Sequence, residues 1–361
     1  MEDPARDRSR RRHGNQLLRL RRYLTRKQDR RPRAGDPSSR HDGIVKILVL
    51  GAAAGGGFPQ WNGNDAAAQR VRAGGEGVRP LTQSSIAVSA DGKRWVLFNA
   101  SPDLRQQIND NAALQPGKQD GLRASPIAAV VLTSADVDHV AGLLNLRESQ
   151  PLALYGHPRV LEVLARNSIF NVLSPGFVAR RALHMGRWQN ILDQEERPLG
   201  IAVRAFAVPG KIALWLEDQS TPGFGTMEGD TLGLEISDGQ RSFFYIPGCA
   251  AMTPELEERL RGAALVFFDG TLWRDDEMIA AGVGTKTGRR MGHMSCSGPD
   301  GAIAAFENLQ VRCKIFIHIN NTNPLLVEGS GERQTAQAAG WEIAHDGMEI
   351  TLERALVPAG I

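Results

Sequence analysis

Apolar positions along the chain fall into short strand-like runs, and this patterning begins abruptly at residue 44. The segment 44–51 is almost continuously apolar and ends in Gly51, which is typical of a strand buried on both faces. Similar runs recur to the end of the chain. The expected strands are 44–51, 85–88, 95–99, 127–133, 152–155, 201–208, 231–236, 242–246, 265–269, 314–319 and 342–350.

Four segments have the apolar spacing of amphipathic helices, namely 158–166, 254–262, 301–308 and 333–339. Thr253 followed by Pro254 favours a helix start, because a hydroxyl cap precedes a proline in the first turn. Strands cluster first, then mix with helices, and the pattern repeats in the second half. This order predicts an α/β fold with two β-rich layers and helices outside, a four-layer sandwich rather than a doubly wound parallel sheet.

The composition is that of a globular protein with ample apolar material for a core. The 361 residues are 42% hydrophobic and 23% charged, which suits one large α/β domain or two small ones. No run approaches the roughly 20 apolar residues of a membrane span, and arginines stand where a secretory signal needs an apolar stretch. We therefore expect a cytoplasmic protein. Three widely separated cysteines, Cys249, Cys296 and Cys313, disfavour a disulfide framework.

The charge is distributed unevenly along the chain. Residues 1–43 hold fourteen Lys and Arg against six Asp and Glu, a net +8, so the total of +3 leaves −5 for residues 44–361. The first segment is also poor in aliphatic side chains, and we predict a basic, disordered extension followed by one folded domain, 44–361. Because the body is mildly acidic, nucleic acid is not an expected partner.

A glycine-rich loop follows the first expected strand at residues 51–59. Its spacing does not match the dinucleotide-binding or P-loop patterns, and residues 60–62 do not start a helix. The loop is better interpreted as a place where small residues let the backbone approach a neighbouring loop or a substrate closely.

The most informative segment follows the expected strand 127–133 and reads Ser134-Ala-Asp136-Val-Asp138-His139. Carboxylates and an imidazole gathered at a strand end are costly to bury unless a cation or hydrogen bonds satisfy them. This cluster is therefore a candidate metal site.

Three further polar side chains stand at strand ends or in glycine-rich turns late in the chain. His318 ends an apolar strand, Asp269 ends another, and His293 lies in a glycine-rich segment between them. Strand ends converge at one edge of a layered sheet, so these groups can meet in space. The alternative remains open, since a lone histidine in a strand is more often a core residue and Asp269 before Gly270 can cap a turn.

Asp138-His139 resembles the second half of the His-x-His-x-Asp-His signature of the metallo-β-lactamase superfamily, with Ser134 and Asp136 in place of the two leading histidines. Those histidines serve the first metal of the two-zinc hydrolases. Within the superfamily, residues 46–352 are similar to the pyrroloquinoline quinone (PQQ) biosynthesis protein B family. The matching stretches, in order, are 53–62, 82–85, 99–103, 138–139, 246–248, 269–271, 282–285, 291–293 and 318–324.

The resemblance implies a metallo-β-lactamase-like αβ/βα sandwich in residues 44–361 that acts as the catalytic domain. It implies one mononuclear Fe(II) and hydroxylation of the tyrosine-derived ring of a cross-linked Glu–Tyr intermediate in PQQ biosynthesis. Asp138, His139 and His318 would be the metal ligands, the two-histidine, one-carboxylate set of non-haem iron oxygenases. The catalytic or orienting groups would be His293, Asp269 and Asp136.

The sequence departs from the family at one further place. Family members carry a Trp-Asn-Cys-x-Cys-x-x-Cys motif for a structural zinc, whereas Gly63, Asp65 and Ala68 stand at the cysteine positions here, so we predict no zinc there. Two alternative functions remain, a metal-dependent hydrolase and a carrier that binds PQQ at a degenerate metal site. In the carrier, Arg105, Lys211 or Lys286 would pair with carboxylates. The expected partner is a small-molecule or dipeptide-like substrate, or PQQ itself. Formation of a homodimer is an alternative that the sequence leaves undecided.

Overall fold

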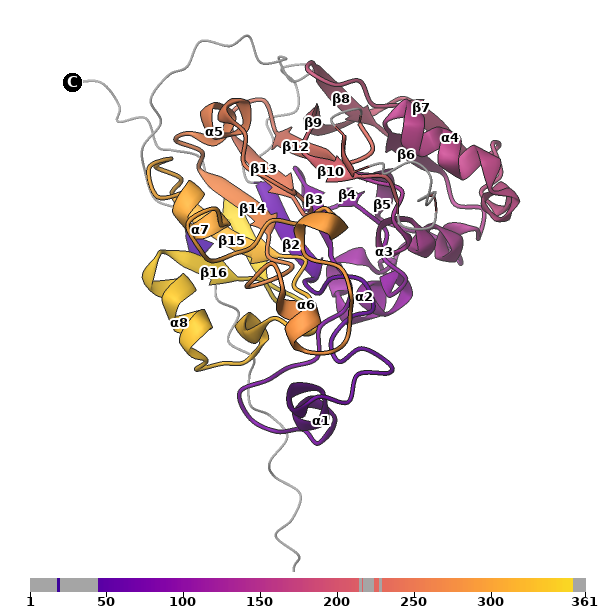
Figure 1. Cartoon of the computed structure of the whole chain (residues 1–361). Helices are drawn as coiled ribbons and strands as arrows, with labels where there is room; N and C mark the ends of the chain where they lie inside the picture. Colours follow the sequence, from indigo (N-terminus) through magenta and orange to yellow (C-terminus); the bar gives the residue numbers. More distant parts are fainter. Residues whose placement is uncertain (1–17, 20–44, 214–215, 217–223, 227–228, 353–361) are drawn as a thin grey trace, which may run out of the picture.

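Two β-sheets pack face to face, with helices on both outer surfaces (Figure 1), which confirms the predicted four-layer αβ/βα sandwich. The computed structural model describes residues 18–19, 45–213, 216, 224–226 and 229–352. The first sheet has the strand order β1-β17-β2-β3-β4-β5-β6-β7, the second β16-β15-β14-β13-β12-β9-β8, and β10 pairs with β11 alone.

The elements have the following bounds. The first sheet contains β1 (Leu18–Arg19), β2 (Val45–Gly51), β3 (Ser85–Ser89), β4 (Trp95–Phe98), β5 (Ile127–Val131), β6 (Leu152–Gly156), β7 (Val178–Ala182) and β17 (Glu349–Leu352). The second contains β8 (Trp188–Leu192), β9 (Pro198–Ala207), β12 (Leu232–Ser237), β13 (Ser242–Ile246), β14 (Leu265–Asp269), β15 (Cys313–Ile317) and β16 (Trp341–Ile343), and the small pair is β10 (Gly210–Lys211) with β11 (Phe224–Thr226). The α-helices are α1 (Ala66–Arg72), α2 (Leu104–Asp110), α3 (Val137–Val140), α4 (Pro158–Arg166), α5 (Pro254–Leu260), α6 (Glu277–Ala280), α7 (Ala302–Ala305) and α8 (Gly331–Ala338). Short 3₁₀ turns are η1 (Ala112–Leu114), η2 (Ala141–Leu146), η3 (Ser168–Val172), η5 (Arg289–Met291) and η6 (Pro324–Leu326).

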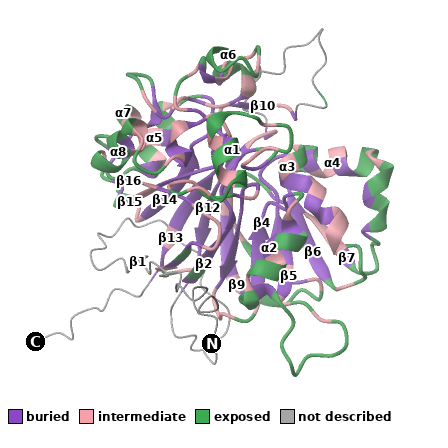
Figure 2. Ribbon diagram, turned by 90° about the horizontal axis from the view of Figure 1, so that it is seen from below, coloured by how far each residue is buried: buried purple, intermediate pink, exposed green. Residues whose placement is uncertain are grey.

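Alternate residues of the first-sheet strands enter two different cores. In β2, Ile47 and Val49 join the cluster between the sheets, whereas Leu48 and Leu50 join the cluster under the helices on the outer face. Because side chains alternate across a strand, a sheet covered on both faces needs apolar residues at every position. This explains the continuous apolar runs in the sequence, and Figure 2 shows strands buried while the helices expose their outer faces.

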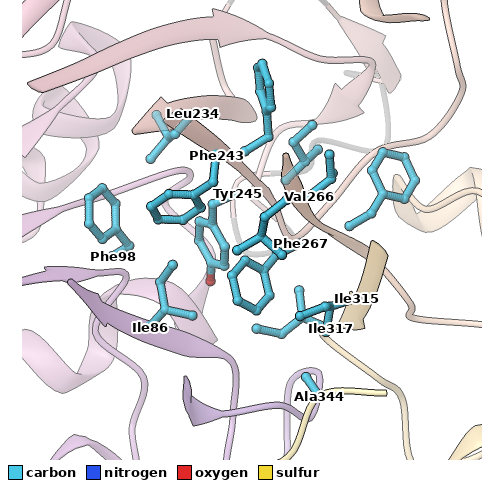
Figure 3. Close-up of a cluster of buried hydrophobic side chains, with 14 of the residues drawn as sticks. Ile86, Phe98, Leu234, Phe243, Tyr245, Val266, Phe267, Ile315, Ile317 and Ala344 are labelled. Carbon is cyan, nitrogen blue, oxygen red and sulfur yellow. The ribbon is translucent and has the colours of Figure 1, made fainter. Parts of the chain in front are cut away.

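The core between the sheets is rich in aromatic side chains (Figure 3). Ile86 and Phe98 come from the first sheet, and Tyr245 and Phe267 from the second. The rings of Tyr245 and Phe267 pack edge to face with centroids 6.4 Å apart. This packing fixes the two sheets relative to each other, and therefore the loops at their edges.

The expected strand 342–350 is wrong, because the chain leaves one sheet and enters the other within it. β16 belongs to the second sheet and β17 to the first. Gly347, with φ 77°, turns the chain between them, and the Asp346 carboxylate accepts hydrogen bonds from the amides of Ala52 and Thr82. An apolar pattern does not reveal this crossing, since both strands are apolar.

Several other elements differ from the sequence prediction. The strands β7 and β8 and the helices α1 and α2 were not expected, and the predicted helix 301–308 is regular only over Ala302–Ala305. The helix start at Thr253 is confirmed, because its side chain accepts a hydrogen bond from the amide of Leu256. Of the predicted disordered extension 1–43, the structure describes Leu18–Arg19 alone, paired with β17, and the remainder lies outside the described residues.

Cys249, Cys296 and Cys313 are buried, and none of them is paired in a disulfide. Within the described part of the chain, no helix is long and apolar enough to cross a membrane.

Candidate metal centre

The candidate ligands stand just beyond the ends of strands in both sheets. Asp138 and His139 lie on α3, shortly after β5 of the first sheet, and His318 directly follows β15 of the second. The structure brings one potential ligand atom from each of the three side chains to within 4.8 Å of the others. Residues 180 positions apart in sequence thus form one compact group.

Asp138 is at the centre of this group. Its Oδ2 lies 2.9 Å from Nε2 of His318 and 3.8 Å from Nε2 of His139. Nε2 of His139 is buried and has no hydrogen-bond partner within the described residues. An unpartnered buried imidazole nitrogen beside a carboxylate is costly unless a cation lies between them, so the residues fit a metal ion.

The electrostatics of the group favour the same interpretation. Burial disfavours the Asp138 carboxylate, but the charge of His139 and the hydrogen bond from His318 outweigh it and hold the pKa of Asp138 well below its usual value. Burial lowers the pKa of His139 against the opposing charge of Asp138, which favours the neutral imidazole that can bind a metal. Burial opposes protonation of His318 too, yet the hydrogen bond and charge of Asp138 raise its pKa.

His318 has a strained backbone, with φ 62° in the left-handed region that non-glycine residues rarely adopt. The Thr271 hydroxyl packs against this conformation, with its oxygen 2.9 Å from the carbonyl oxygen of His318. Such strain persists only where the surroundings enforce it, and it clusters at functional sites.

The glycine-rich loop packs directly against the candidate ligands. The amide of Ala54 donates to the carbonyl of Ile319, and the amide of Ile319 donates to the carbonyl of Ala52, so the loop runs beside His318 like an added strand. A side chain at Gly55 would place its Cβ 3.6 Å from Cγ of Asp138. The backbone of the glycine-rich loop therefore makes its predicted close approach to the candidate metal centre.

Asp269 caps a turn and also orients His293. Its Oδ1 accepts from the amide and the hydroxyl of Thr271, at 3.0 and 2.6 Å, and its Oδ2 accepts from the amide of Cys249 at 2.8 Å. Nδ1 of His293 lies 2.7 Å from the same Oδ2. Because both oxygens are occupied by protein donors, Asp269 suits orientation of a histidine better than metal binding.

Two hydroxyl groups in the site were not identified as candidates from the sequence. Thr271 Oγ1 lies 2.8 Å from Nδ1 of His318 and 3.0 Å from Nδ1 of His293, and Ser134 Oγ lies 2.7 Å from Nδ1 of His139. Ser134 Oγ also lies 3.3 Å from Oδ2 of Asp136, which connects Asp136 to the candidate ligand His139.

A cavity of about 920 Å³ opens onto the candidate ligands. Asp136, His293, Lys211 and Lys286 line it, whereas Arg105 does not. Such a volume falls within the range of pockets for small molecules. Carboxamides complete the polar wall, from Gln60, Asn62, Gln83, Asn320 and Asn321.

Comparison with known proteins gives this architecture a family. The sequence profile described as "Beta-lactamase superfamily domain" matches residues 94–319. Coenzyme PQQ synthesis protein B of Xanthomonas oryzae pv. oryzae is 54% identical over 308 residues, covering 85% of this chain and 100% of that protein. The protein of the same name from Gluconacetobacter diazotrophicus is 53% identical over an equal length.

Solved structures agree with the sequence relatives. The zinc-bound PqqB from Methylobacterium extorquens superimposes with a TM-score of 0.80 at 48% identity, covering 86% of this chain and 100% of that one. A diphosphatase of the PhnP family, at 20% identity, has a TM-score of 0.60 over 87% of this chain and 99% of its own, and shares the fold. The chain belongs to the coenzyme PQQ synthesis protein B family of the β-lactamase superfamily.

Proposed function

We propose that this protein acts in the biosynthesis of coenzyme PQQ as an iron(II)-dependent oxygenase. Its substrate would be a Glu–Tyr-derived intermediate, whose tyrosine ring it hydroxylates. The observation that carries the proposal is the group Asp138, His139 and His318, because two imidazoles and one carboxylate with open positions are the ligand set of non-haem iron oxygenases. Membership of the family supports the pathway.

Iron(II) held by Asp138, His139 and His318 would supply the activation of dioxygen. The protein's own contribution is orientation and proton transfer. His293 donates Nδ1–H to Asp269, which leaves Nε2 as the nitrogen available to a molecule in the cavity. We assign His293 as the base that takes the proton of the ring hydroxyl, with Asp269 as the residue that orients it.

The cavity supports a carboxylate-bearing substrate of dipeptide size. Its volume of about 920 Å³ exceeds the need of a single amino acid. Lys211 and Lys286 line it beside the candidate ligands and suit the carboxylates of a Glu–Tyr compound. The same two lysines suit PQQ, so the carrier function remains the second candidate. Ser134 and Asp136, in place of the superfamily's leading histidines, disfavour a two-metal hydrolase.

Anaerobic reconstitution tests the proposal. The protein is loaded with iron(II), supplied with a cross-linked Glu–Tyr compound and exposed to oxygen, while oxygen uptake and substrate mass are followed. We expect uptake together with added oxygen on the substrate. Oxygen consumption without a gain of mass would overturn the hydroxylase, and tight binding of PQQ without turnover would favour the carrier.

Ligand variants test the metal site separately from turnover. Asp138→Ala and His318→Ala should each lose stoichiometric metal, whereas His184→Ala, at an exposed histidine outside the cavity lining, should retain it. Full metal content in either ligand variant would show that the ligand set is wrong.

A further inference from the structure

We propose that Thr271 and Ser134 are positioning residues whose hydroxyl oxygens accept Nδ1–H of His318 and His139, so that Nε2 is the nitrogen that each ring presents to the metal. The inference deepens the proposed function, because it rests on the ligand set named there. Each hydroxyl contacts a carboxylate, Thr271 that of Asp269 and Ser134 that of Asp136, and each carboxylate accepts the hydrogen of its hydroxyl.

The hydrogen-bond partners of the Thr271 hydroxyl determine which atom donates to it. A hydroxyl has one hydrogen to donate and two lone pairs. Thr271 Oγ1 lies 2.6 Å from Oδ1 of Asp269 and 2.9 Å from the carbonyl oxygen of His318, and a carboxylate or carbonyl oxygen can only accept. The hydrogen of Thr271 is therefore donated to one of these oxygens. Nδ1 of His318, 2.8 Å away, must then donate to Thr271 Oγ1.

The Ser134 hydroxyl has the same relation to His139. Ser134 Oγ accepts from the amide of Asp136 at 3.2 Å and lies 3.3 Å from Oδ2 of Asp136 and 2.7 Å from Nδ1 of His139. We assign its one hydrogen to the carboxylate, which makes Nδ1 of His139 the donor to Ser134. A second hydroxyl, Thr133, approaches this nitrogen at 3.5 Å, but its hydrogen is directed to Oδ1 of Asn99 at 3.0 Å. Within the described residues, every group that faces Nδ1 of His139 is thus an acceptor.

Both histidines have Nε2 toward Asp138, at 2.9 Å for His318 and 3.8 Å for His139. Nε2 of His318 donates to Asp138 in this structure, and a bound metal would replace that proton. The two ligands are oriented by equivalent sets of carboxylate, hydroxyl and imidazole from opposite sheets. The Thr271 set is the tighter, since its contact with Asp269 is shorter than that of Ser134 with Asp136 and it also packs against the strained backbone of His318. Loss of Thr271 should therefore cost more metal affinity than loss of Ser134.

Zinc binding to the whole chain tests the inference, with Thr271→Val as the isosteric variant that lacks the hydroxyl and Thr271→Ser as the matched control that keeps it. Competition with a chromophoric chelator should show about 10- to 100-fold weaker zinc binding for Thr271→Val. Thr271→Ser should bind within a few-fold of the parent, and Ser134→Ala should fall between the two. Equal affinity in Thr271→Val and the parent would overturn the inference.

A spectroscopic readout separates ligand orientation from general damage to the fold. With ¹⁵N-labelled histidine, two-bond nitrogen–proton correlations of the zinc-loaded parent should show Nδ1–H and metal-bound Nε2 for His318 and His139. Thr271→Ser should keep this pattern even if it is less stable, and Nδ1 coordination of either ring in the parent would contradict the proposal.

The two proposals fail in different ways. If Asp138→Ala and His318→Ala retain zinc, the ligand set is wrong. If these variants lose zinc while Thr271→Val keeps full affinity and the same tautomers, the ligand set stands and the positioning role is wrong.

Discussion

At the residue scale, His293 and His318 lie close together but face different carboxylates. Their rings stack with centroids 5.2 Å apart, and both contact Thr271 through Nδ1. They differ in the carboxylate that each faces. Nε2 of His318 points to Asp138, whereas Nδ1 of His293 points to Asp269, whose oxygens already have protein donors. We therefore expect His318, whose Nε2 faces Asp138, to bind the metal, and His293, whose Nδ1 is held by Asp269, to remain outside the ligand set.

The variant His293→Gln tests this division of tasks. We expect metal content to remain stoichiometric while kcat falls by about 10²- to 10⁴-fold, the usual contribution of a general base. The measurement is turnover of the cross-linked Glu–Tyr compound beside metal analysis of the same sample. Loss of metal in His293→Gln would instead identify His293 as a ligand.

Lys211 offers a test of substrate recognition in the same cavity. Its side chain packs against Gly292, where an added Cβ would lie 3.1 Å from Cγ of Lys211, so the lysine stands next to His293. Lys211→Met keeps the aliphatic stem and removes the charge. Since a charge-assisted hydrogen bond contributes about 1.5–3 kcal/mol, we expect KM to rise about tenfold or more with a smaller change in kcat.

Lys118, an exposed lysine that does not line the cavity, is the matched control for Lys211. Its replacement by methionine should leave KM unchanged. A fall in kcat with constant KM for Lys211→Met would argue against carboxylate binding and for a role in the chemical step.

At the element scale, the sequence predicts those strands whose two faces both meet an apolar core. β5 has Ala129 and Val131 in one cluster and Val130 in the other, so its apolar run is unambiguous. The edge strand β7 carries Arg180 and Arg181 at half-buried positions, and such a strand has no apolar signature. The candidate site divides in the same way. Acids and histidines at strand ends were recognisable, but the hydroxyls behind them depend on contacts between β14, β15 and the α3 segment that no local pattern encodes.

Polar contacts hold the segment 60–75, which includes the short helix α1. Its helix α1 buries only Ala68 and projects from the body of the sandwich (Figure 1). The Arg72 guanidinium donates to the carbonyls of Gln60, at 2.7 Å, and Gly63. Asp65 caps the helix by accepting from the amide of Ala68. Because Gln60 and Asn62 line the cavity, this arginine bridge holds part of the cavity wall.

We therefore expect Arg72→Ala to loosen that wall. Hydrogen exchange of the amides in residues 60–75 should accelerate, and KM should rise while metal content stays the same, because the ligands lie elsewhere. Arg70→Ala is the matched control, since it removes the same charge from the same helix without removing a bridge to these carbonyls. Equal exchange in the two variants would show that Arg72 does not order the segment.

At the scale of the whole molecule, the candidate metal centre joins the two sheets. Asp138 and His139 follow β5 of one sheet, and His318 follows β15 of the other. A metal bound only by the folded arrangement stabilises the fold by mass action, about 2.7 kcal/mol at a concentration 100 times the Kd. Zinc should therefore raise the Tm of the parent by several degrees, and His318→Ala should show no such rise. A similar rise in both would place the stabilising zinc elsewhere.

The crossing between the sheets at Asp346 makes stability depend on pH. Burial raises the pKa of Asp346 to about 7, and the charge of Asp103 adds to the effect, against the hydrogen bonds from Thr82 and Ala52. Between about pH 4 and pH 7 the folded protein keeps a proton that the unfolded chain releases, since an unperturbed aspartate has a pKa of about 3.9. The folded state then binds more protons, so the contribution of Asp346 to stability is complete below pH 4 and declines as pH rises through 7.

Asp346→Asn isolates this contribution, because the amide does not titrate. The free energy of unfolding of the parent, measured with denaturant at several pH values, should fall relative to that of Asp346→Asn by at most about 1.4 kcal/mol per pH unit across that interval. Above pH 7 the difference should level off, since Asp346 is then ionised in both states of the parent. A difference that stays constant from pH 4 to pH 8 would mean that Asp346 is ionised in the folded protein throughout, with its charge stabilised by the amides of Ala52 and Thr82.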